Sequence, residues 1–122
     1  CARVRAATCM AMAMEISKEL VSSVVAIARL HKDMEFMSWI LGVESNEGQL
    51  RATKLYAPKQ ASDKSEVWET ADSCLGVLQA LDLRGEKVIG WVHSHPTFDA
   101  FLSSVDQHQQ FLVQSLESRA IA

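Results

Sequence analysis

The chain has 122 residues, enough for one domain, and its 48% apolar and 22% charged residues are typical of a globular protein. Twelve Lys and Arg against fifteen Asp and Glu give a formal charge of −3, which supplies no basic field, so we expect no nucleic-acid partner. The three cysteines form neither a disulfide framework nor a CxxC zinc pattern, which indicates a reducing compartment.

The N-terminal residues 1–13 are interpreted as an upstream extension without an assignable role, and residues 14–122 as the domain itself. Glu15, Lys18 and Glu19 interrupt any apolar core that a secretory signal would need. No apolar run approaches the length that spans a bilayer. We therefore expect a cytoplasmic protein without membrane insertion.

The first half of the chain predicts one helix and a strand pair. Apolar residues recur every three or four positions from Ile16 to Ile27, and Ser17 is a suitable N-cap, so an amphipathic helix is expected there. Residues 36–43 are apolar on both faces, which predicts a central strand covered on both sides. A turn at residues 46–48 and the alternating residues 50–57 predict the antiparallel return strand.

The second half predicts a loop, two helices and another buried strand. Polar residues 58–65 indicate the loop, and apolar spacing between Ala71 and Leu81 predicts a helix that ends near Gly85. Residues 88–93 predict a buried strand, stopped by Pro96. After a loop to Ser103, the apolar residues Val105, Leu112 and Leu116 outline a third helix. Residues 120–122 resemble the opening of another strand, so the fold class is α/β, with helices packed on a small sheet.

Two histidines and one aspartate form the candidate metal site. His93 and His95 are two residues apart, so on a strand they point to the same side and reach one ion. The loop after Pro96 returns the chain, so that Asp106 falls in the first turn of the next helix. Two imidazoles and one carboxylate suit Zn²⁺, and three protein ligands leave a fourth position for water, as catalytic zinc sites do.

Each half of this pattern also has a plain structural interpretation. Histidines two apart on a strand often arise by chance. Ser103 and Asp106 have the spacing of an N-cap followed by an acidic first turn, which stabilises a helix without any metal. The combination of strand end, proline and returning helix favours the metal site.

These residues carry a family resemblance. His93-Ser94-His95-Pro96, then Ser103 and Asp106, resembles the signature of the JAMM (MPN+) metalloproteases. Residues 34–42 are similar to that family's first strand, with Glu35 at the position of its catalytic glutamate. Residues 90–97 and 100–108 are most similar to the AMSH-type deubiquitinases within the family.

The resemblance implies an MPN fold, related to cytidine deaminases, in which helices flank a mixed central sheet. The family fold normally continues with further strands and a closing helix, so residues 14–122 are expected to be an incomplete domain. Such a domain would expose apolar surface, and formation of a homodimer is one way in which that surface could be buried.

The resemblance also implies a function: hydrolysis of ubiquitin–lysine isopeptide bonds, in polyubiquitin chains of the open, extended linkage. His93, His95 and Asp106 would hold one catalytic Zn²⁺, with Glu35 as general base and acid for the water that zinc activates. Ser103 would donate a hydrogen bond to the oxyanion. Partners could place the protein at endosomes.

Substrate contacts are implied at Trp68, Thr70 and Phe101, with ordinary helix packing an equal alternative for the first two. Asp99 stands where the animal AMSH-type enzymes have threonine, so the linkage preference stays open.

Two other functions remain open. One is a hydrolase of the same fold that acts on a ubiquitin-like or sulfur-carrier protein. The other is a non-catalytic MPN scaffold, against which the complete residue set argues. Of the remaining candidates, His108 is expected at the surface, and Trp39 and Trp91 in the core.

Overall fold

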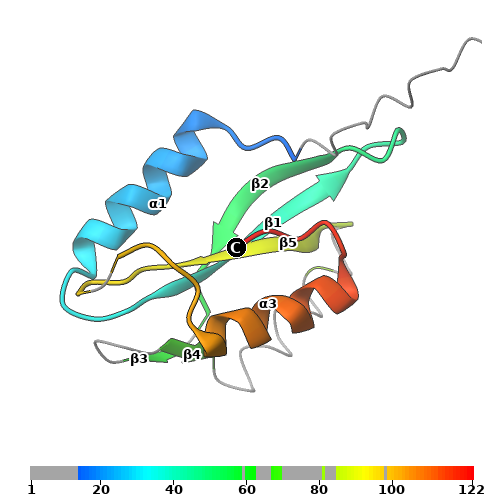
Figure 1. Ribbon diagram of the computed structural model, residues 1–122. Coiled ribbons are helices and arrows are strands. Elements are labelled where there is room, and N and C mark those ends of the chain that lie inside the picture. The colour runs from blue at the N-terminus through cyan, green and yellow to red at the C-terminus, as the bar shows by residue number, and fades with distance from the viewer. Residues whose placement is uncertain (1–13, 59, 63–66, 70–80, 82–84, 98) are drawn as a thin grey trace, which may run out of the picture.

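The computed structural model describes residues 14–58, 60–62, 67–69, 81, 85–97 and 99–122. Its elements are shown in Figure 1 and follow the order α1 (Lys18–Leu30), β1 (Met37–Glu44), β2 (Leu50–Tyr56), β3 (Gln60–Ser62), β4 (Val67–Glu69), β5 (Lys87–His93) and α3 (Ser104–Leu116). Within these residues, no helix combines the length and the apolar character that crossing a membrane requires.

The main sheet has the order β2-β1-β5, with both pairs antiparallel. The central strand, its return strand and the second buried strand are therefore confirmed. Single parallel bridges extend the sheet at both edges, from Glu15 to Arg51 beside β2 and from Gly90 to Ile121 beside β5. The expected mixed sheet is thus an antiparallel core with one parallel bridge at each edge. The strand-like end at residues 120–122 is one of those bridges.

The two faces of the sheet are covered by different helices (Figure 1). On one face, Met37, Trp39 and Leu41 of β1 share a core cluster with Trp91 and with Val113 of α3. On the other face, Ile40, Leu50 and Ile89 form a cluster against which Leu20 of α1 packs. Because successive strand residues point to opposite faces, the doubly apolar sequence of β1 is what a strand between two helices needs.

Helix α1 begins as its sequence predicts. The Ser17 hydroxyl accepts a hydrogen bond from the backbone N–H of Leu20 at 3.1 Å and caps the helix. None of the helix residues is fully buried, and Val21 and Val25 are 52% and 43% exposed. The helix therefore covers the sheet with one edge only.

Helix α3 lies where the sequence predicts it, but the apolar residues that outline it do not face the core. Val105, Leu112 and Leu116 are 64%, 47% and 85% exposed, and the buried residue of the helix is Val113. The inward side carries polar residues at helical spacing, Asp106 and Gln110, which bond to the site and to the sheet. The spacing of apolar residues does not identify the inward face of this helix, because the residues that contact the sheet and the candidate site are polar.

The segment between β2 and β5 also differs from its prediction. Part of the expected loop at residues 58–65 is strand β3, which pairs antiparallel with β4 in a two-stranded sheet. The predicted second helix lies outside the described residues except for Leu81, which is buried in the core.

Candidate metal centre

Strand β5 ends at His93, so only one of the two histidines lies on the strand. The sequence predicts that both histidines lie on one strand and so point to the same side. The two imidazoles do lie close together, but strand geometry is not the reason, because His95 is not on the strand. His95 lies two residues beyond the strand end, yet its Nε2 is 2.8 Å from Nε2 of His93. Contacts outside the strand ladder must therefore position His95.

The ring of His95 is held by the loop that follows it. Its Nδ1 lies 3.0 Å from the backbone carbonyl oxygen of Asp99. A carbonyl oxygen only accepts, so Nδ1 carries the proton and donates, which leaves the lone pair of Nε2 facing the cluster. The Phe101 ring meets the imidazole edge to face, with centroids 4.9 Å apart. These contacts fix the tautomer as ligating histidines require.

The ring of His93 is held from the other side, by the core. It stacks on the Trp91 indole with centroids 4.7 Å apart and planes at 13°. The indole N–H donates to the side-chain oxygen of Gln110 at 2.8 Å, and the Gln110 amide donates to the Ala120 carbonyl at 2.8 Å. Burial lowers the pKa of His93, against the opposing effect of Asp106. The lowered pKa favours the neutral imidazole, which is the form that ligates a metal.

Asp106 acts in the helix cap and in the cluster at once. The Ser103 hydroxyl accepts from the Asp106 N–H at 3.2 Å, and Asp106 Oδ2 accepts from the Ser103 N–H at 2.7 Å. The same Oδ2 lies 3.2 Å from His93 Nε2. Burial would raise the pKa of this carboxyl, but hydrogen bonds from Ser103 and the nearby histidines together lower it. The helix-cap interpretation is therefore confirmed, and the capping carboxylate oxygen is at the same time one atom of the candidate metal site.

Glu35 lies beside the cluster, on the segment that leads into the neighbouring strand β1. It precedes β1 by two residues, is only 4% exposed, and places Oε1 3.8 Å from Nε2 of His95. A buried carboxyl group that faces a ligand candidate from a different strand is placed to move protons next to a bound ion.

The three candidate ligand atoms lie close enough to one another to share one metal ion. Their separations are 2.8 Å between the two imidazole nitrogens, 3.2 Å from His93 to Asp106 and 3.8 Å from His95 to Asp106. Ligand bonds of about 2.0–2.2 Å in a tetrahedron place neighbouring donor atoms about 3.3 Å apart. The donor set and its spacing therefore fit Zn²⁺, and we find this group of three among the described residues.

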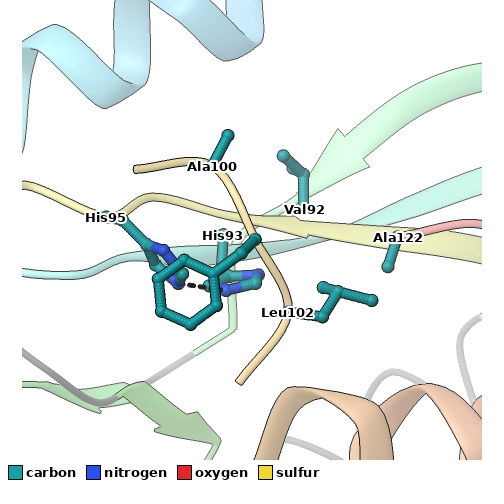
Figure 2. A pocket seen from close by; sticks show the side chains of 7 residues that line it. Val92, His93, His95, Ala100, Leu102 and Ala122 are labelled. Atoms are coloured by element: carbon teal, nitrogen blue, oxygen red, sulfur yellow. Dashed lines mark hydrogen bonds between the residues drawn. The ribbon is translucent and has the colours of Figure 1, made fainter. Parts of the chain in front are cut away.

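An apolar cavity opens next to the histidines, as Figure 2 shows. It has a volume of about 520 Å³. Its wall consists of both histidines with Val92, Ala100, Phe101, Leu102 and Ala122. Phe101 is 52% exposed, so a ligand in this cavity would meet its ring and the imidazole of His95 together.

The remaining predicted site residues are distributed as follows. Trp68 lies in β4 and pairs with Ala61, and Thr70 lies outside the described residues. His108 is exposed, as expected. Trp39 and Trp91 are 7% and 2% exposed, which confirms that both belong to the core.

Sequence reasoning missed three residues that support the ligands. Gln110 follows Asp106 by one helical turn, so i, i+4 spacing could have placed it on the inward face. Ser94 and the Asp99 carbonyl lie in the loop around the histidines and give no such periodic signal.

The sequence that carries this site matches a known protein family. The family described as "JAB1/Mov34/MPN/PAD-1 ubiquitin protease" matches residues 11–119, which include every element described above. The chain belongs to this family. Its MPN fold and its relation to the JAMM deubiquitinases, predicted from the histidine signature, are therefore confirmed.

Similar MPN proteins come from both the proteasomal and the AMSH-like branches. The 26S proteasome non-ATPase regulatory subunit 14 of Dictyostelium discoideum is 37% identical over 100 residues, covering 78% of this chain and 32% of the relative. The ubiquitin carboxyl-terminal hydrolase RPN11 of Saccharomyces cerevisiae is 35% identical over 96 residues, covering 73% and 30%. The AMSH-like ubiquitin thioesterase 2 of Arabidopsis thaliana is 30% identical over 114 residues, covering 88% and 48%. The chain thus spans between 30% and 48% of the length of these relatives.

Proposed function

We propose that this protein is a zinc-dependent isopeptidase that hydrolyses the bond between a ubiquitin C-terminus and a lysine amine. The observation that carries the proposal is the convergence of His93, His95 and Asp106, with Glu35 beside them, in a member of a ubiquitin protease family. The proposal includes a cytoplasmic location, ubiquitin or polyubiquitin as partner, and a preference for one chain linkage.

The site supports this chemistry through a division of roles. His93, His95 and Asp106 would hold Zn²⁺, which lowers the pKa of a coordinated water towards about 7. Glu35 would take the proton from the attacking water and return it to the leaving lysine amine. A base of this kind contributes about 10²–10⁴-fold in rate.

Ser103 has a proposed role beside its structural one. Its oxygen accepts the Asp106 N–H as helix cap, and the hydroxyl proton of the same group would donate to the oxyanion of the scissile carbonyl. Loss of one such donor typically costs about 10²–10³ in rate.

The cavity beside the histidines supports a peptide as substrate. Its apolar wall, with the exposed Phe101 ring at its mouth, would take the residues next to the scissile bond. Trp68 and Thr70 are proposed as further ubiquitin contacts on the segment that includes β4.

The test is cleavage of linkage-defined diubiquitins, with zinc content measured by mass spectrometry. We expect cleavage by the wild-type protein, loss with a strong chelator, restoration by Zn²⁺, and a fall of about 10²-fold or more in Glu35→Gln with zinc still bound. Cleavage that survives Glu35→Gln or the chelator would overturn the mechanism. Equal cleavage of all linkages would overturn only the linkage preference, and zinc binding without cleavage of any diubiquitin would favour another carrier protein or a scaffold.

A further inference from the structure

Ser94, between the two histidines, makes a two-point contact with the segment that carries Glu35. Its backbone N–H donates to the Phe36 carbonyl at 3.0 Å, and its side-chain Oγ accepts from the Phe36 N–H at 3.1 Å. Both bonds join residue 36 to residue 94, immediately beyond the last β1–β5 pair, Met37 with His93.

This contact replaces one bond of the sheet ladder with a side chain. In a regular antiparallel pair, two opposed residues exchange both N–H···O=C bonds. Here the Phe36 N–H goes to the Ser94 hydroxyl oxygen and not to the Ser94 carbonyl. The chain after His93 can therefore leave the strand direction and turn towards Pro96 while it stays attached to β1.

The contact between Ser94 and Phe36 lies next to both Glu35 and the two histidines. Glu35 immediately precedes Phe36, and His93 and His95 flank Ser94, so the contact ties the proton-transfer group to two ligand candidates. The Phe36 side chain is 3% exposed, so its N–H lies where a lost partner is costly to replace with water. The Ser94 hydroxyl therefore bonds to the backbone directly between Glu35 and the start of β1.

We infer that Ser94 is a positioning residue that sets the geometry between the general base and the metal ligands, an inference that rests on the proposed function. Threonine retains the hydroxyl and suits a strand end, and Ser94 borders a separate cavity of about 440 Å³ beside α1, which gives room for the added methyl group. Alanine removes only the acceptor.

The experiment compares Ser94→Ala, Ser94→Thr and a matched control, Ser45→Ala, by kinetics and by Co²⁺ substitution. Ser45 Oγ also accepts a backbone N–H, from Gln49 at 3.1 Å, but in the turn at the opposite end of β1. For Ser94→Ala we expect a fall of about 10–100-fold in kcat with KM unchanged, and a changed Co²⁺ visible spectrum. Ser94→Thr and Ser45→Ala should match the wild-type protein in both measurements.

The outcomes separate this inference from the proposed function. A wild-type kcat and Co²⁺ spectrum in Ser94→Ala, or equal losses in Ser94→Thr or Ser45→Ala, would overturn it. If the wild-type protein binds Co²⁺ but cleaves no diubiquitin, the proposed function fails. The Co²⁺ spectra of the Ala and Thr variants then still decide whether the hydroxyl sets the geometry of the cluster.

Discussion

The two ends of the β1–β5 pair hold two polar clusters built on the same three elements. At one end, Glu35 before β1, His93 and His95 at the end of β5, and Asp106 at the start of α3 come together. At the other end, Glu44 of β1, Lys87 of β5, and Glu117 and Arg119 after α3 come together. The two clusters use the same elements, but only the second contains Lys and Arg side chains beside its carboxylates.

The second cluster is compensated by its own side chains. Glu117 accepts from Arg119 Nε at 2.6 Å and from Lys87 Nζ at 2.5 Å, and Glu44 accepts from the same two cations. Two carboxylates meet two permanent cations, so the cluster joins the elements without any ligand. At the first end, two carboxyl groups meet two imidazoles, and burial lowers the pKa of His93. The zinc ion proposed for that end would supply the positive charge that its own side chains lack.

The largest expected effect falls on the metal end. Asp106→Asn keeps a side-chain oxygen for the Ser103 N–H but removes the anionic ligand, so we expect zinc affinity to fall by more than about 100-fold with the helix retained. Isothermal titration with Zn²⁺ measures the change. Glu117→Gln at the opposite end is the control and should leave zinc affinity unchanged. Equal losses of zinc affinity in both variants would show that zinc does not bind specifically at the end that holds Asp106.

A smaller effect is expected for the support of His93. Gln110→Leu removes the acceptor of the Trp91 indole, on which His93 stacks, and should lower zinc affinity or kcat about 10-fold. Gln114→Leu is the matched control, because Gln114 donates to the same Ala120 carbonyl at 3.0 Å, whereas the Trp91 indole N–H donates to Gln110. If both variants lose activity to the same extent, the Ala120 contact and not the indole is responsible.

At the compensated end, the expected effect is on stability. Glu117→Gln removes the charge that Lys87 and Arg119 share, so we expect Tm to fall by a few degrees with zinc affinity unchanged. Differential scanning calorimetry measures the fall. Glu47→Gln, in the exposed turn between β1 and β2, removes the same charge and should leave Tm unchanged.

The smallest effect is a pH dependence of stability. Hydrogen bonds from Arg119 and Lys87 lower the pKa of Glu44 and of Glu117 from the ordinary 4.5 to about 2. Since the folded-state pKa is lowered, this stabilisation is complete above about pH 5 and is lost as the pH falls towards 2. Urea unfolding across this range should show a shallower decline in Glu117→Gln than in the wild-type protein. If the free energy of unfolding falls equally with pH in both proteins, the charge of Glu117 does not contribute to the pH dependence of stability.

The elements that could be predicted were those with a clear local sequence pattern. The strand β1 was predictable because it is apolar on both faces, and α1 because Ser17 caps an apolar repeat. The inward face of α3 was not predictable, because Asp106 and Gln110 occupy positions that a core helix would fill with apolar side chains. The hairpin of β3 and β4 was missed because a three-residue strand is too short to show alternation.

The sequence by itself determined the residue types of the candidate site and their order, because the histidine signature and Glu35 are local patterns. Only the tertiary structure decided how these residues meet. His95 leaves the strand, the Asp99 carbonyl orients its ring, and Ser94 ties it to the segment of Glu35. These contacts join residues far apart in the chain or involve backbone atoms, whose partners no local pattern specifies.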